Sequence, residues 1–85
     1  MAFAENLRQL RLEQFLSQAE LARRAGLHAL TVTRLEAGTT TPTTRSVRAL
    51  AEALSVNPQE LATPDEVAEL RRVLRSSAQR GGPHA

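Results

Sequence analysis

The 85-residue chain is informative first in what it lacks, since it contains no cysteine, lysine, tyrosine or tryptophan. Without cysteine it has no disulfide, no thiolate metal ligand and no cysteine nucleophile. Its two aromatic residues, Phe3 and Phe15, are too few for the stacking platforms that bind single-stranded nucleic acid. No apolar run approaches the ~18 residues of a membrane span, and the first residues do not resemble a signal peptide. We therefore expect a soluble, cytoplasmic protein without a membrane partner.

The charge of the chain is nearly balanced, although its isoelectric point of about 11.0 is high. All 11 basic residues are arginine, against 9 acidic residues, so the net charge is only +2. With lysine, tyrosine and cysteine absent, almost nothing titrates between the carboxylates and the guanidinium groups, and a small excess of arginine keeps the isoelectric point high. The isoelectric point is therefore poor evidence for nucleic-acid binding, and non-specific binding should be weak.

Residues suited to catalysis are also scarce. The only histidines are His28 and His84, and the carboxylates are isolated members of helix caps and helix faces. Neither a metal cluster nor a nucleophile with a neighbouring base can be assembled from them. The sequence predicts a protein that is not an enzyme and holds no metal or cofactor.

Apolar residues at helical spacing, with no period-two alternation, predict an all-α fold. Capping boxes at Ser17–Glu20, Asn57–Glu60 and Thr63–Glu66 mark three helix starts, and Gly26 and Gly38 mark two helix ends. The expected helices cover about residues 1–14, 17–26, 28–37, 43–54, a short segment from 57 that contains Leu61, and 64–77. The residues expected to face inward are Phe3, Leu7, Leu10, Leu21, Ala22, Ala25, Val32, Leu35, Val47, Leu50, Ala51 and Leu54. We expect a five-helix domain over residues 1–62, an additional C-terminal helix over 63–78 and a disordered tail over 79–85.

The shortest predicted connection is the most specific feature. The second helix ends at Gly26 and the third begins within about three residues, a spacing typical of a helix-turn-helix. The segments Leu16-Ser17-Gln18-Ala19-Glu20-Leu21-Ala22, Gly26, Thr31-Val32-Thr33-Arg34-Leu35-Glu36-Ala37-Gly38, Pro42 and Leu50-Ala51-Glu52-Ala53-Leu54 carry the pattern. Over about residues 3–62 the chain resembles the phage-repressor and Cro type of helix-turn-helix family. The resemblance implies a repressor-like fold that binds double-stranded DNA.

In that family the third helix lies in the major groove and the amino end of the second helix meets the phosphate backbone. The resemblance implies that Gln18 binds a phosphate and braces the recognition helix, while Arg34 pairs with guanine or holds a phosphate. The residues expected at the DNA are Gln18, His28, Ala29, Leu30, Thr31, Thr33, Arg34, Thr39 and Arg45. The family resemblance also implies a structural ion pair between Arg11 and Glu36, which would hold the recognition helix against the first helix.

Ala29 and Leu30 depart from the family pattern, which commonly has hydrogen-bonding side chains at these places. Apolar side chains there contact only thymine methyl groups. Two interpretations follow: a T-rich operator that is recognised partly by its shape, or a recognition helix whose exposed Leu30 binds another protein.

The additional C-terminal helix has to bury an apolar face consisting of Val67, Leu70, Val73 and Leu74. Leu12 and Phe15 are also apolar where the family is usually polar or has a turn residue. These residues form either a two-fold interface, which would set two recognition helices one turn of DNA apart, ~34 Å, or a contact within one chain. The leading hypothesis is a transcriptional repressor that binds a pseudo-palindromic operator as a homodimer. The alternative is an antitoxin or adaptor of the same fold whose main partner is a protein.

Overall fold

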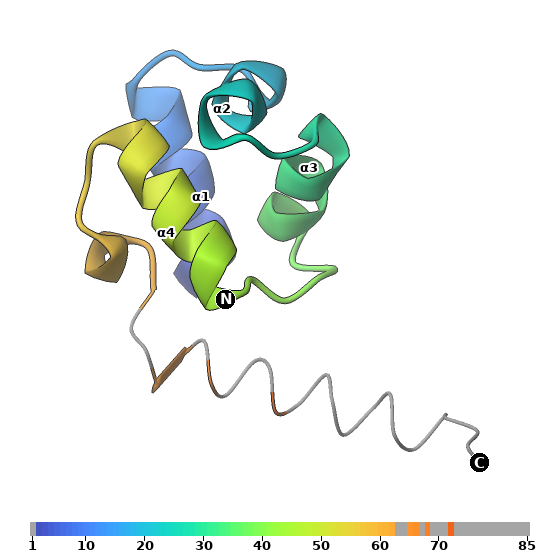
Figure 1. The fold of residues 1–85 in the computed structure, drawn as a ribbon, viewed down its shortest axis with the longest axis vertical. Helices are drawn as coiled ribbons and strands as arrows, with labels where there is room; N and C mark the ends of the chain where they lie inside the picture. Colours follow the sequence, from blue (N-terminus) through green and yellow to red (C-terminus); the bar gives the residue numbers. More distant parts are fainter. Residues whose placement is uncertain (1, 63–64, 67, 69–71, 73–85) are drawn as a thin grey trace.

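A computed structural model describes residues 2–62, 65–66, 68 and 72, and within these residues all regular structure is helical. The elements follow the chain as α1 (Ala2–Glu13), α2 (Gln18–Ala25), α3 (Ala29–Ala37), α4 (Thr44–Leu54) and a single 3-10 turn, η1 (Pro58–Glu60) (Figure 1). The predicted all-α class is confirmed. The four α-helices begin and end within about two residues of the predicted positions.

Two helices begin at reciprocal caps. At the start of α2, the Glu20 amide donates to Ser17 Oγ at 3.0 Å and the Ser17 amide donates to Glu20 Oε1 at 2.8 Å. At the start of α4, Ser46 takes the place of the acidic residue: its amide donates to Thr43 Oγ1 at 3.0 Å, and its hydroxyl oxygen accepts from the Thr43 amide at 2.9 Å. The first cap was predicted, whereas the second lacks the Glu or Gln that marks the motif in a sequence.

All four α-helices end in the same motif, in which a residue with positive φ lets the amide of the next residue donate to the carbonyl five positions earlier. The positive-φ residues are Phe15 (57°), Gly26 (71°), Gly38 (75°) and Ser55 (58°). After α1, for example, the Leu16 amide donates to the Arg11 carbonyl at 3.1 Å. Glycine adopts this backbone conformation without steric penalty, but a phenylalanine does so at a cost.

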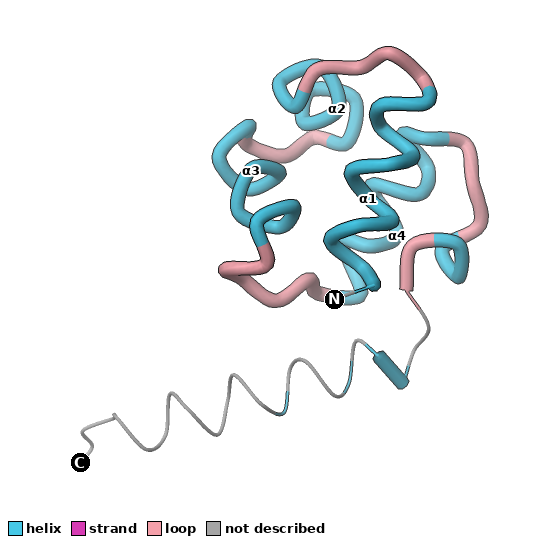
Figure 2. The backbone as a smooth tube through the Cα atoms, turned by 180° about the vertical axis from the view of Figure 1, so that it is seen from behind, coloured by secondary structure: helices cyan, strands magenta, loops and turns pink. Residues whose placement is uncertain are grey.

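One hydrophobic core joins the elements. The helix α2 packs against α3 and α4, α1 packs against α3, and η1 packs against α4 (Figure 2). The buried apolar residues are Phe3, Leu7, Leu16, Leu21, Ala22, Val32, Leu35, Val47, Leu50, Ala51, Leu54, Leu61 and Ala62. Leu10 and Ala25 are partly buried against this core, so every residue predicted to face inward does so. Leu16, Leu61 and Ala62 were not predicted.

The predicted fifth helix is wrong in its extent, because η1 is a single turn of three residues. The Asn57 amide donates to the Glu60 carboxylate at 2.9 Å, as the capping signal predicts. The turn does not continue, since Leu61 and Ala62 both turn inward and are buried. The correct count is four α-helices and one 3-10 turn in residues 2–62.

The predicted C-terminal helix (63–78) and tail (79–85) lie largely outside the described residues. Asp65, Glu66, Ala68 and Arg72 are described, and each has helical backbone conformation. Glu66 Oε2 accepts a hydrogen bond from the Phe3 amide at 3.2 Å, in the first turn of α1. A carboxylate at this end of a helix is stabilised by the unpaired amides and the helix dipole. This contact ties Glu66 to the amino end of α1.

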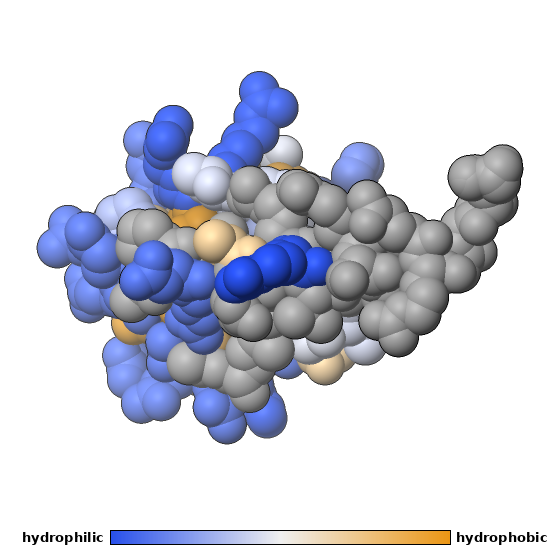
Figure 3. Space-filling view, turned by 90° about the horizontal axis from the view of Figure 1, so that it is seen from below, coloured by the Kyte–Doolittle hydropathy of each residue, from blue (hydrophilic) through white to orange (hydrophobic). Residues whose placement is uncertain are grey.

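Within the described residues, no helix has the length and apolar character needed to span a bilayer. Seen from below the view of Figure 1, the described atoms are mostly hydrophilic, with hydrophobic atoms in small areas (Figure 3). The large apolar side chains that stay exposed in the described residues are Leu12, Phe15 and Leu30.

Candidate nucleic-acid interface

The turn between α2 and α3 sets the position of α3 on the domain. The left-handed backbone of Gly26 ends α2, Leu27 packs against the core, and His28 begins α3 without a side-chain hydrogen bond. On α3 itself, Val32 and Leu35 are buried and hold the helix to the domain. The opposite side of α3 is thereby left exposed.

The structure places the predicted α3 residues mainly on this open side. His28, Ala29, Leu30, Thr33 and Arg34 are exposed, and Thr31 is half-buried. Leu30 keeps 55% of its surface exposed, which is unusual for a leucine in the described residues. The face therefore combines one cation and one imidazole with small and apolar side chains, and it has little capacity for hydrogen bonds to base edges.

Two further predicted residues flank the helix. Thr39 follows α3 directly and is exposed, and its hydroxyl donates to the Arg34 carbonyl at 3.2 Å. Arg45 is exposed in the first turn of α4. The Thr39 hydroxyl hydrogen is thus already used within the protein, whereas Arg45 presents its charge to solvent.

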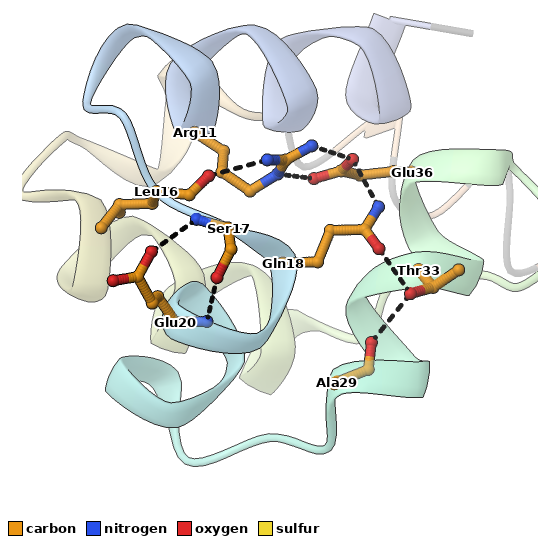
Figure 4. A network of polar contacts seen from close by, with 8 residues as sticks. All are labelled: Arg11, Leu16, Ser17, Gln18, Glu20, Ala29, Thr33 and Glu36. Carbon is orange, nitrogen blue, oxygen red and sulfur yellow. Dashed lines mark hydrogen bonds and ion pairs between the residues drawn. The ribbon is translucent and has the colours of Figure 1, made fainter.

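Arg11 and Glu36 form the ion pair that the family resemblance implied, and they join α1 to the end of α3. Arg11 Nε donates to Glu36 Oε2 at 2.6 Å and Arg11 Nη2 donates to Glu36 Oε1 at 2.9 Å (Figure 4). Arg11 Nη1 donates to the Leu16 carbonyl at 2.7 Å. The side chains are only 10% and 5% exposed, so a planar guanidinium meets a carboxylate in a largely desolvated position.

The pKa values of the pair reflect this environment. Burial acts to raise the pKa of Glu36, but the hydrogen bonds from Arg11 and Gln18 and the charge of Arg11 outweigh burial, and the pKa lies below its ordinary value. The hydrogen bond to Glu36 raises the pKa of Arg11, against the opposing effect of burial. Both residues are therefore charged at neutral pH.

Gln18 extends this ion pair to the exposed side of α3. Its Nε2 donates to Glu36 Oε1 at 3.0 Å, and its Oε1 accepts from the Thr33 hydroxyl at 2.7 Å (Figure 4). The same hydroxyl lies 3.1 Å from the Ala29 carbonyl. The bond between Gln18 and Thr33 was not predicted, because nothing in the sequence indicates a contact between polar side chains 15 positions apart.

Of the apolar residues predicted at a dimer or partner interface, only Leu12 and Phe15 lie in the described part of the chain. Leu12 is 52% exposed and Phe15 is 93% exposed, on the outer side of α1 and in the turn that follows it. Val67, Leu70, Val73 and Leu74 lie outside the described residues. Among the described residues, no group of three or more histidine or acidic side chains is arranged to hold a metal ion.

The comparisons with known proteins agree with this architecture. The profile of the family described as Helix-turn-helix matches residues 7–61, which include the whole of α2, the turn and α3. The chain belongs to the helix-turn-helix family. No curated protein matches the chain.

Two solved structures are similar to this chain in both sequence and fold. One is the restriction-modification controller protein C.AhdI from Aeromonas hydrophila, with 37% sequence identity, a TM-score of 0.69, and coverage of 71% of this chain and 91% of that one. The other is the DNA-binding domain of the P22 C2 repressor, with 26% identity, a TM-score of 0.70, and coverage of 78% and 87%. The predicted likeness to the phage-repressor type is confirmed.

Proposed function

We propose that this helix-turn-helix protein is a sequence-specific, double-stranded DNA-binding transcriptional regulator, and in its simplest form a repressor. The observation that carries the proposal is the recognition helix α3, whose exposed face lies beside a glutamine braced by a desolvated ion pair. The likeness to a repressor's DNA-binding domain and to a controller protein supports the same function. Because the proposed ligand is the genome, we place the protein in the cytoplasm.

In the proposed complex, α3 enters the major groove and Gln18 meets the backbone. Arg34 pairs with guanine or a phosphate, and Leu30 and Ala29 contact thymine methyl groups. His28, Thr31, Thr39 and Arg45 complete the proposed interface. Arg34 and Arg45 are its cations, so each subunit neutralises ~2 phosphates. The logarithm of the affinity should then fall with the logarithm of the salt concentration with a slope of about −2 per subunit.

Such a shallow electrostatic contribution favours a dimer on a pseudo-palindromic operator, since two weak half-sites then act together. We propose that residues 63–78 supply the two-fold interface, with Leu12 and Phe15 as part of it. The solution masses of the full chain and of a chain ending at residue 63 test this. An unchanged dimer in the shorter chain would eliminate the segment as the source of dimerisation.

The main experiment is selection of bound duplexes from a random pool at two salt concentrations. An enriched palindrome with T-rich half-sites is expected. Substitution of Arg34 by alanine should weaken binding to it about 5- to 150-fold for each half-site, because a bidentate contact with guanine is worth ~1–3 kcal/mol. Replacing Arg48, which is exposed in α4 and outside the proposed interface, should have little effect and serves as the control.

A second function is favoured by one observation: Leu12, Phe15 and Leu30 are large apolar side chains that stay exposed in the described residues. An antitoxin or adaptor of the same fold would use these residues to bind another protein. Absence of any enriched duplex at low salt would favour this function over the first.

A further inference from the structure

A directional chain of hydrogen bonds runs from the interior to the exposed face of α3. The Arg11 guanidinium donates to both oxygens of Glu36, Gln18 Nε2 donates to Glu36 Oε1 at 3.0 Å, and the Thr33 hydroxyl donates to Gln18 Oε1 at 2.7 Å. Exposure increases along this chain: Arg11 and Glu36 are almost fully desolvated, Gln18 is half-buried and Thr33 is exposed. The network therefore ends at the surface proposed to contact DNA.

Glu36 and Thr33 together determine the orientation of the Gln18 amide. If the amide were rotated by 180°, its oxygen would lie about 3.0 Å from Glu36 Oε1, and an acceptor would then face a charged acceptor. The Thr33 hydroxyl, which can donate to the amide oxygen, favours the same orientation. The second N–H of the amide has no partner among the described residues, so Gln18 offers a donor to its surroundings.

The same contacts limit what Thr33 can do. A hydroxyl has a single hydrogen, and both acceptors within reach of Thr33 Oγ1, Gln18 Oε1 and the Ala29 carbonyl, belong to the protein. Its donor is therefore engaged before any ligand binds.

We propose that Thr33 is a positioning residue: its hydroxyl, with Glu36, holds the Gln18 amide so that the free N–H donates to a phosphate oxygen of the DNA backbone. This rests on the proposed DNA-binding function and gives a role within it to Thr33, one of the residues expected at the DNA: its hydroxyl supports the backbone contact and does not read a base. A phosphate oxygen is the appropriate acceptor, since the amide offers a donor and lies in the first turn of α2, where the helix dipole favours an anion.

The first test compares duplex affinity for the full-length wild type, T33V, T33S, Q18A and the Q18A/T33V double variant at one salt concentration. Valine keeps the shape of threonine but removes the hydroxyl, and serine keeps the hydroxyl. We expect T33V to weaken binding about 3- to 10-fold, T33S to bind like the wild type, and the double variant to bind within about twofold of Q18A. T40V is the matched control, because Thr40 is also exposed but is not part of the network.

The loss in T33V should be the same for every base sequence of the half-site, since the contact it supports is to the backbone. Two results would overturn the proposal: a T33V loss that adds in full to that of Q18A, or one that vanishes when a single base pair is changed. Either would mean that Thr33 contacts DNA itself.

A second measurement uses the free protein. In the nuclear magnetic resonance spectrum, T33V should shift the two side-chain amide protons of Gln18 and speed their exchange with water, whereas T33S should leave both unchanged. Unchanged Gln18 signals in T33V, with normal DNA binding by the wild type, overturn this proposal alone. Shifted Gln18 signals in T33V, with no duplex bound by the wild type, overturn the DNA function and the phosphate contact while the hydrogen bond itself stands.

Discussion

Replacing Glu36 by alanine should destabilise the domain strongly, because it leaves the Arg11 guanidinium desolvated without its counter-charge. The change removes two hydrogen bonds from Arg11 and one from Gln18, all to a carboxylate whose side chain is 5% exposed. Arg11 keeps its bond to the Leu16 carbonyl, which compensates only part of the loss. Breaking a buried pair from one side costs about 3–5 kcal/mol.

The effect should be easy to measure. For a domain of this size, ~1 kcal/mol lowers the melting temperature by about 4–8 °C, so Glu36→Ala should lower it by roughly 12 °C or more. Urea denaturation provides the same comparison as a free energy of unfolding. Glu52→Ala on α4 is the control, since Glu52 is exposed and a surface substitution of this kind changes stability by less than about 0.5 kcal/mol.

Replacing both Arg11 and Glu36 by methionine separates the loss of the ion pair from the cost of leaving Arg11 buried without its counter-charge. The double variant removes both charges, so it should be more stable than Glu36→Ala alone. Equal unfolding midpoints for Glu36→Ala and Glu52→Ala would refute the reasoning. The buried glutamate would then contribute no more to the free energy of unfolding than an exposed one.

Three further predictions concern pH and the helix ends. Because the pKa of Glu36 is lower in the folded than in the unfolded chain, its contribution to stability is present above the unfolded value of about 4.3 and is lost as pH falls through the folded value; acid titration of the unfolding midpoint should therefore be flatter in Glu36→Gln. Ser55→Gly should stabilise the domain by about 0.5–1 kcal/mol in urea denaturation, since φ of Ser55 is 58° and its side chain is exposed, whereas Ser55→Ala should not; a loss of stability with glycine would show that the serine side chain makes a stabilising contact. Glu66→Ala should lower the free energy of unfolding by about 0.5–1 kcal/mol through loss of the Phe3 amide contact, and an unchanged midpoint would mean that this contact is not formed in solution.

Most of the helical framework could be predicted from the sequence, because its signals act over a few residues. Ser17 and Glu20 lie three positions apart and form the predicted cap, and Gly26 and Gly38 end the helices they were expected to end. The periodic apolar residues correctly predicted the core. The same local reasoning overestimated the segment after Asn57, because a cap says where a helix begins and not how long it runs.

The contact of the predicted site residues with DNA stays a prediction, whereas the helix α3 and the pair of Arg11 and Glu36 are present in the structure. The helix-turn-helix spacing predicted the first, and the family resemblance implied the second. Local pattern did not reveal that the Thr33 hydroxyl faces Gln18, nor that Phe15 would take a left-handed conformation while almost fully exposed. These features depend on how the helices cross and on which side of each remains uncovered.

The sequence by itself therefore determined the four α-helices, the cap at Ser17 and Glu20, most of the core residues and the helix-turn-helix spacing, since each follows from neighbours within about one or two turns. It also showed that the high isoelectric point follows from the missing lysine and tyrosine. Only the tertiary structure decided which polar groups meet, because Arg11 and Glu36 are 25 positions apart and Gln18 and Thr33 are 15 apart. Contacts at such separations form only after α1, α2 and α3 have packed around a common core, and that packing orients the amide proposed to face DNA.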